Sequence, residues 1–111
     1  MLSLQGWKCL VLGGGGFIGL NLCQALHACG AFVRVYDRGD RKDALPDAVE
    51  WRSGDFSDLQ RLDDAVRGCD AVFHLISQIP PRIAADGPIA SLMLPDIDGT
   101  AHLLDICHRR G

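Results

Sequence analysis

The stretch that decides the fold runs from Leu12 to Gly19 and reads Leu-Gly-Gly-Gly-Gly-Phe-Ile-Gly. Its glycines satisfy the spacing G-x-G-x-x-G, and the apolar run that precedes them, Lys8–Leu12, suits a strand buried on both faces. An apolar stripe at helical spacing follows, made of Ile18, Leu22, Ala25 and Cys29. Strand, glycine turn and helix in this order are the setting in which such glycines bind phosphate.

Each glycine has a physical task in this setting. Gly13 permits the tight turn, Gly16 lets a pyrophosphate approach the backbone, and Gly19 lets the helix lie close to the sheet. The amides of the first helical turn, including those of Phe17 and Ile18, lie at the positive end of the helix dipole and would attract the phosphates. We therefore expect a bound dinucleotide here, and the alternative is a flexible glycine turn without a ligand.

Predicted strands and helices alternate along the rest of the chain. Further strands are predicted at 31–36, 49–53 and 71–76. The helix before the last of these has an apolar face of Leu59, Leu62 and Val66, and we expect Ser57 to cap it and Gly68 to end it. This alternation predicts an α/β protein with right-handed crossovers, the four-strand N-terminal half of a Rossmann-type doubly wound parallel sheet in the order 3-2-1-4.

The connecting segments are less regular. Residues 38–47 are polar and read as a loop or a short helix, and three prolines between Gln78 and Ala90 indicate a long loop. Helical spacing resumes in a stripe formed by Ile97, Ala101, Leu104 and His108. Pro95 disfavours a continuous helix across its position.

The composition fits one globular domain. The chain has 111 residues, of which 48% are hydrophobic and 23% charged. A net charge of −3 argues against a nucleic-acid partner, and no apolar run is long enough to cross a membrane. Five cysteines without metal-ligand spacing are expected to be free thiols, so no metal site is predicted. With no signal-peptide features at the start, we expect a cytoplasmic protein.

Asp37 ends the second predicted strand, eighteen positions after Gly19. A carboxylate there would accept hydrogen bonds from both hydroxyls of the adenosine ribose and would repel a 2′-phosphate, which favours NAD over NADP. Arg38 comes next and leaves three roles open: accompanying a 2′-phosphate, stacking on adenine, or facing water.

These residues resemble the extended short-chain dehydrogenase/reductases, the NAD-dependent epimerase/dehydratase family typified by UDP-glucose 4-epimerase. The resemblance covers essentially the whole chain, and its segments are Gly13–Gly19 with Asn21-Leu22, Asp37-Arg38, Gly54–Asp58, Asp70–Ser77 and Asp98–Asp105. It implies that NAD is the cofactor and that the complete protein removes a hydride from the sugar of a nucleotide-sugar substrate and returns it.

The resemblance also implies roles for individual residues. Asp55 would bond the adenine amino group, although Asp after a glycine is also a common turn residue. Phe56 would contact the edge of the adenine ring. Three residues after the fourth strand would lie along the cofactor: Leu75, Ile76 and Ser77.

Two other positions need comment. His74 lies on an apolar strand and is expected to be a core histidine, not a catalytic one. Asp96 departs from the family, which has Asn at this point close to the nicotinamide half. An ionised acid can accept but not donate a hydrogen bond, so the role of Asp96 stays open.

The catalytic Tyr-x-x-x-Lys pair of the family is missing from this sequence. The only tyrosine is Tyr36, the residue four positions later is Asp40, and the lysines are Lys8 and Lys42. We therefore assign no catalytic residue and expect no turnover from these residues alone.

Two explanations fit this absence. The sequence is part of a complete epimerase or dehydratase, or it is a non-catalytic dinucleotide-binding sensor or interaction module; the glycine turn of a flavoprotein fits less well. An unpaired edge at the fourth strand and the apolar stripe near the end also predict self-association into a homo-oligomer.

Overall fold

The computed structural model describes residues 3–76 and 89–110, and the side chains of the second stretch from residue 98 onward. The chain divides into two compact units, Met1–Leu75 and Ile76–Gly111. The first unit contains the sheet, and the second contains helix α3 (Ile89–Arg110).

The first unit is built on a four-stranded parallel sheet. Its strands are β1 (Lys8–Leu12), β2 (Phe32–Asp37), β3 (Glu50–Ser53) and β4 (Ala71–His74). The spatial order is β3-β2-β1-β4, and β1 pairs in parallel with both β2 and β4. This confirms the predicted fold class and the order 3-2-1-4.

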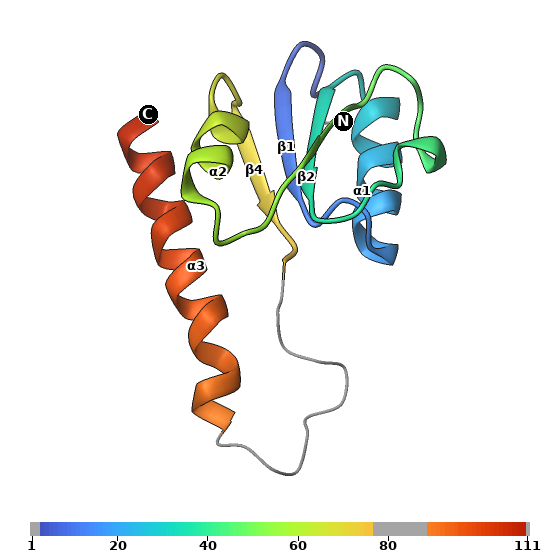
Figure 1. Ribbon diagram of the computed structural model, residues 1–111. Coiled ribbons are helices and arrows are strands. Elements are labelled where there is room, and N and C mark those ends of the chain that lie inside the picture. Colours follow the sequence, from blue (N-terminus) through green and yellow to red (C-terminus); the bar gives the residue numbers. More distant parts are fainter. Residues whose placement is uncertain (1–2, 77–88, 111) are drawn as a thin grey trace. The chain divides into compact units, whose positions relative to one another are not determined.

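Helices α1 (Phe17–Ala28) and α2 (Leu59–Val66) lie on opposite sides of the sheet (Figure 1). Because both faces are covered, four of the five residues of β1 are buried, as expected for a central parallel strand. The core on the α1 side joins alternate residues of β1 and β2 to the helix; its buried members include Cys9, Val11, Cys23, Leu26, Val33 and Val35.

The core-facing side of α1 differs from the predicted one. The buried residues of this helix are Gly19, Cys23 and Leu26, whereas Ile18 and Ala25 of the predicted stripe are exposed. The reason is the close contact at Gly19: this residue must face the glycine turn at the end of β1, and its position sets the rotation of the whole helix. The helix ends before Gly30, whose φ of 88° suits only glycine.

The residue that caps α2 is Asp58, not Ser57 as predicted. The Asp58 carboxylate accepts a bond of 3.2 Å from the amide of Arg61. Ser57 lies one residue before the cap position, and its amide and its hydroxyl both donate to Oδ1 of Asp55. The predicted apolar face is largely confirmed, since Leu62 and Val66 are buried, while Leu59 is exposed.

Strand β4 ends at His74, two residues earlier than predicted. Its partner β1 ends at Leu12, where the chain enters the glycine turn, and one further bond joins the Leu75 amide to the Leu12 carbonyl oxygen at 2.9 Å. The polar segment after β2 contains a short 3-10 helix, η1 (Lys42–Ala44), in agreement with the prediction of a loop or short helix.

Helix α3 corrects two predictions. It begins at Ile89, inside the segment expected to be loop, and it continues through Pro95. A proline removes one backbone donor from a helix, and the bonds of the neighbouring residues maintain the helical path on either side. Most of the expected loop, and the side chain of Asp96, lie outside the described residues.

Arg34 of β2 joins three elements of the first unit. Its Nε bonds Glu50 of β3 at 2.9 Å, and its Nη1 donates to the carbonyl oxygens of Ala65 and Arg67 at 2.8 Å each. The guanidinium therefore donates to carbonyl groups at the end of α2, because the last carbonyls of a helix have no amide partner within the helix. Its side chain is only 14% exposed.

Candidate functional site

The glycine turn connects the end of β1 to the start of α1. Gly13 has a φ of 82°, a left-handed conformation that favours glycine, and its amide donates to the carbonyl oxygen of Tyr36 at 2.9 Å. The turn closes with a 3.3 Å bond from the amide of Gly16 to the carbonyl oxygen of Gly13. The predicted role of Gly13 as the tight-turn residue agrees with this geometry.

Two other glycines are required by contacts within the protein. A Cβ on Gly14 would lie 2.6 Å from Cγ1 of Val35, and a Cβ on Gly19 would lie 2.6 Å from Cα of Gly14. Both positions therefore exclude any larger residue. Helix α1 approaches the turn this closely only because Gly19 has no side chain.

Gly16 is different, because nothing in the protein demands a glycine there. Its φ of −79° and ψ of 174° are accessible to any residue. A Cβ would meet only the carbonyl oxygen of Gly13, at an ordinary contact distance of 3.7 Å. The absence of a side chain leaves space on the outer side of the turn, where a pyrophosphate would approach. The position thus fits the bound group that the glycine spacing implies.

The amides at the start of α1 face this space. Among the described residues no side chain caps the helix, and its first turn contains no acidic residue. The first amides of a helix have no acceptor inside it, and they carry the positive end of its dipole. The side chains of Phe17 and Ile18 are 85% and 67% exposed, so they leave the amides accessible. This end of α1 is suited to an anion.

Asp37 lies beside the turn at the end of β2, as predicted. Its Oδ2 accepts a 2.9 Å bond from the amide of Gly15, and its Oδ1 accepts a 3.0 Å bond from the amide of Gly39. The sequence indicated the position of this carboxylate but not its bond to Gly15, which joins residues 22 positions apart.

Two arginines lie near this carboxylate. Arg38 is exposed, and its charge contributes to lowering the pKa of Asp55. Arg41 donates from Nη1 to the carbonyl oxygen of Gly15 at 3.3 Å. Sequence reasoning missed Arg41, because no motif distinguishes it from the other charged residues of its segment.

Asp55 and Phe56 follow β3. The amide and hydroxyl of Ser57 both donate to Oδ1 of Asp55, at 3.0 and 2.9 Å, and these two bonds are the main cause of the lowered pKa of Asp55. Asp55 therefore acts as a turn residue through one oxygen, and the bonds just described leave Oδ2 to other partners. Phe56 is buried and its ring lies 5.0 Å from that of His74. A ligand would thus meet Phe56 through its backbone. His74 is half-buried on β4 and packs against this ring, and its non-catalytic role stays a prediction.

The remaining predicted residues fall at or beyond the end of β4. Leu75 is exposed, and the bond from its amide to the Leu12 carbonyl oxygen places it next to the end of β1. Ile76 begins the second unit, and its proposed contact with a cofactor stays a prediction. Ser77 lies outside the described residues.

Tyr36 has a structural role. Its hydroxyl is buried and donates to the carbonyl oxygen of Asp55 at 2.6 Å, and burial is the main cause that raises the pKa of Tyr36 to about 12. A tyrosine in this state does not act as a base near neutral pH. Lys42 likewise donates to two carbonyl oxygens, those of Pro46 and Asp47, at 3.0 Å each.

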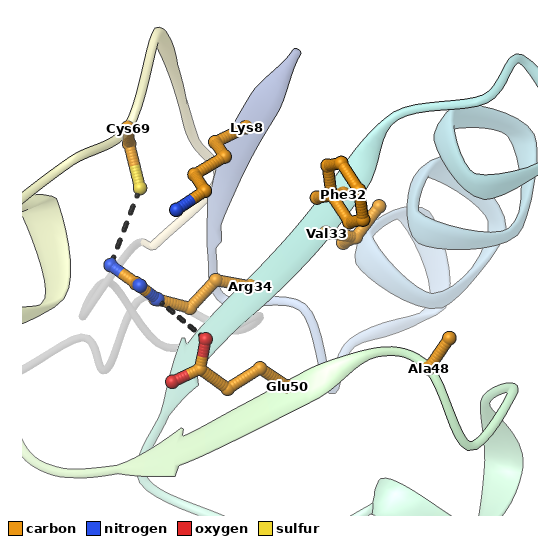
Figure 2. A pocket seen from close by; sticks show the side chains of 7 residues that line it. All are labelled: Lys8, Phe32, Val33, Arg34, Ala48, Glu50 and Cys69. Atoms are coloured by element: carbon orange, nitrogen blue, oxygen red, sulfur yellow. Dashed lines mark hydrogen bonds and ion pairs between the residues drawn. The ribbon is translucent and has the colours of Figure 1, made fainter. Parts of the chain in front are cut away.

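A separate cavity of about 150 Å³ lies at the amino-terminal ends of the strands, away from the glycine turn. Figure 2 shows Arg34 crossing it, with interactions to Glu50 and Cys69. Lys8, Phe32 and Glu50, which line the cavity, are the first residues of β1, β2 and β3. The glycine turn and Asp37 lie at the carboxyl ends of these strands, so this cavity is not part of the nucleotide site.

None of the helices in the described part of the chain combines the length and the apolar character needed to span a bilayer.

Comparison with known proteins identifies the family. The NAD dependent epimerase/dehydratase family matches residues 9–111. Among curated proteins, the chain is 32% identical over 97 residues to the 2-alkyl-3-oxoalkanoate reductase of Shewanella oneidensis, covering 87% of this chain and 24% of that protein. It is 31% identical over 113 residues to a 3 beta-hydroxysteroid dehydrogenase/Delta 5-->4-isomerase of Mycobacterium tuberculosis, covering 99% and 30%.

Solved structures also match the chain. The epimerase Mth375 of Methanothermobacter thermautotrophicus matches with a TM-score of 0.82 and 27% identity, covering 97% of this chain and 33% of that one. A short-chain dehydrogenase/reductase superfamily protein of Agrobacterium tumefaciens with bound NAD matches with a TM-score of 0.73 and 28% identity, covering 94% and 30%. The chain thus spans from 24% to 33% of the length of these relatives. With its sheet order, its glycine turn and a family match over nearly every residue, the chain belongs to the NAD-dependent epimerase/dehydratase family of short-chain dehydrogenase/reductases.

Proposed function

We propose that the glycine turn and the adjoining ends of β2 and β3 bind NAD, and that the chain is the NAD-binding part of a hydride-transferring enzyme. The observation that carries this proposal is the geometry at Gly16. The protein itself could accommodate a side chain there, yet the position is bare, and it adjoins the uncapped start of α1. A ligand that approaches the backbone explains both features.

The surrounding residues supply the remaining contacts. The amides of Phe17 and Ile18 would hold the pyrophosphate, and the carboxylate of Asp37 would accept bonds from the ribose hydroxyls. Oδ2 of Asp55 would accept a bond from the adenine amino group, while Oδ1 keeps its bonds to Ser57. When bound, NAD supplies a hydride acceptor for the reaction of the complete enzyme.

NAD is favoured over NADP because Asp37 would repel a 2′-phosphate. Arg38 and Arg41 oppose this effect: Arg38 follows Asp37 in the chain, and Arg41 donates to the carbonyl oxygen of Gly15, the residue whose amide bonds Asp37. Asp37 is nevertheless bonded to the glycine turn itself, whereas Arg38 is exposed. We therefore expect a preference for NAD that is moderate in size.

The reaction of the complete enzyme is a separate question. We propose a nucleotide-sugar epimerase or dehydratase of the UDP-glucose 4-epimerase type; a UDP-N-acetylglucosamine 4-epimerase of Bacillus cereus matches with a TM-score of 0.71 at 26% identity. A second candidate is an oxidoreductase that interconverts a hydroxyl and a keto group on a less polar substrate. The names of the reductase and the hydroxysteroid dehydrogenase among the curated relatives favour this candidate. Both reactions need an acid–base pair that is not among these 111 residues.

Calorimetric titration with NAD tests the proposal, using the wild-type chain and Gly16→Ala. Alanine fits the conformation of Gly16, so the variant should remain folded, with a cost of up to about 1 kcal/mol at this N-cap position. Its methyl group would occupy the approach to the backbone, and we expect NAD affinity to fall about tenfold or more, on the order of 1.4 kcal/mol. Wild type that binds no NAD at millimolar concentration, or a variant that binds as tightly as wild type, would overturn the proposal.

A further inference from the structure

Trp51 in β3 contacts both the glycine turn and the turn that follows β2. A Cβ on Gly15 would lie 3.1 Å from Cη2 of the Trp51 ring, so the ring packs against the bare edge of that glycine. The indole Nε1 donates a 2.9 Å bond to the carbonyl oxygen of Gly39. Trp51 is half-buried against the core on the α1 side, which holds its ring in place.

Gly39 lies between Trp51 and Asp37 in a series of hydrogen bonds that uses its carbonyl on one side and its amide on the other. The amide of Gly39 donates to Oδ1 of Asp37 at 3.0 Å, and Oδ2 of Asp37 accepts from the amide of Gly15 at 2.9 Å. The indole of Trp51 is thus connected through Gly39 and Asp37 to the centre of the glycine turn. The hydroxyl of Ser53 also reaches the Gly39 carbonyl, but at 3.4 Å it makes a weaker bond.

This series determines how the Asp37 carboxylate is presented. Each carboxylate oxygen can accept two hydrogen bonds, and each oxygen of Asp37 receives one from a backbone amide. The two bonds fix the orientation of the group and leave one lone-pair position on each oxygen. The carbonyl of the same residue is held by Trp51 on β3, which restricts the backbone on the other side of the Gly39 Cα.

We propose that Trp51 is a positioning residue for cofactor selection. Its indole N–H fixes Gly39 and, through it, the Asp37 carboxylate, so that the site prefers a free ribose 2′-hydroxyl to a 2′-phosphate. The inference rests on the proposed NAD function. It adds a determinant of cofactor preference, Trp51, whose indole N–H acts through Gly39 and not by contact with the cofactor.

Trp51→Phe tests the inference, because phenylalanine keeps an aromatic ring and removes the indole N–H. We expect NAD affinity to fall about threefold to tenfold, the effect of one net hydrogen bond, while NADP affinity changes less. The ratio of the two affinities should therefore narrow by about threefold or more. Trp7→Phe is the matched control: Trp7 is the only other tryptophan, it is exposed, and it lies just before β1 at the opposite edge of the sheet. The ratio of NAD affinity to NADP affinity in Trp7→Phe should equal that of wild type.

The outcomes separate the two proposals. Wild type that binds neither nucleotide overturns the proposed function and this inference with it. Wild type that binds NAD, with an unchanged NAD-to-NADP ratio in Trp51→Phe, overturns only the inference. A lower melting temperature with equal losses for both nucleotides has the same meaning, since that result describes a structural role.

A second measurement applies if Trp51→Phe does not unfold cooperatively. In Trp7→Phe the emission of Trp51 is the only tryptophan signal. We expect it to change on titration with NAD, with a midpoint that matches the calorimetric Kd. Emission that stays constant while calorimetry detects binding would overturn the inference.

Discussion

The hydroxyl of Tyr36 donates a 2.6 Å hydrogen bond to the carbonyl oxygen of Asp55, connecting the end of β2 to the turn that follows β3. The contact explains why residue 54 is glycine, since a Cβ there would lie 2.7 Å from Cζ of the tyrosine. The only tyrosine of the chain thus holds in place the turn that contains the proposed adenine contact.

Tyr36→Phe should lower the free energy of unfolding by about 1 kcal/mol, the net value of a buried hydrogen bond. The loss is expected to be at the lower end of the range because the amide of Asp58 also donates to the Asp55 carbonyl oxygen, at 3.0 Å. Urea denaturation followed by circular dichroism measures the change. A variant as stable as wild type would show that the bond contributes nothing to stability.

Alkaline pH should destabilise the protein through the same residue. Burial raises the pKa of Tyr36 to about 12, so the unfolded chain releases this proton at a lower pH than the folded chain. The contribution is fully present below the unfolded pKa of about 10 and is lost as pH rises toward about 12, a change of about 2–3 kcal/mol. The buried thiol of Cys23, with its pKa raised by burial to about 11, adds an earlier loss that begins near pH 9.

The difference between wild type and Tyr36→Phe isolates the tyrosine from the cysteine. Urea midpoints measured from pH 8 to pH 11 should converge as the tyrosine of wild type loses its advantage. Midpoints that run parallel over this range would contradict the assignment.

Arg34→Met should destabilise the fold by about 2–4 kcal/mol, because it leaves two carbonyl oxygens at the end of α2 and the Glu50 carboxylate without this donor. Arg52→Met is the matched control. Its Nε bonds the same Glu50 at 3.0 Å, but its side chain is 39% exposed, and a loss of about 1 kcal/mol or less is expected. Equal losses in thermal unfolding would show that burial of the guanidinium does not matter.

The stability difference between wild type and Arg34→Met should depend on pH because of Glu50. Burial acts to raise the pKa of Glu50, but the bonds from Arg34 and Arg52 outweigh it and lower the pKa. A carboxylate with a lowered pKa stabilises the fold above its unfolded value and loses that contribution as pH falls through the folded value. The difference between wild type and Arg34→Met should therefore shrink below about pH 4, near the ordinary pKa of Glu.

Asp37→Asn should weaken the preference for NAD. The substitution keeps one oxygen acceptor and removes the negative charge, so NADP affinity should rise while NAD affinity falls about threefold to tenfold through loss of a charged acceptor. Asp40→Asn is the control, since the carboxylate of Asp40 accepts a bond from the amide of Lys42 within its own loop. Calorimetry with both nucleotides measures the ratio. Parallel losses for NAD and NADP would mean that the charge of Asp37 does not discriminate between them.

The sequence by itself determined the order of the elements. Three local signals gave this order: the apolar run Lys8–Leu12, the glycine spacing, and the glycines Gly30 and Gly68 that follow the helices. They are local because strand burial, tight turns and helix ends depend on residues that are neighbours in the chain. The parallel sheet order followed from those elements and from the handedness of crossovers. The position of Asp37 at the end of β2 was predictable for the same reason.

Only the tertiary structure decided which side chains meet. The bond from Gly15 to Asp37, the reach of Arg41 to the glycine turn and the contact of Trp51 with Gly39 join segments from 12 to 26 residues apart. The sequence also misplaced the buried face of α1, because the close approach of Gly19 to the turn sets the rotation of that helix. Such contacts depend on the packing of elements from different parts of the chain, and no local spacing encodes the angle at which a helix meets a sheet.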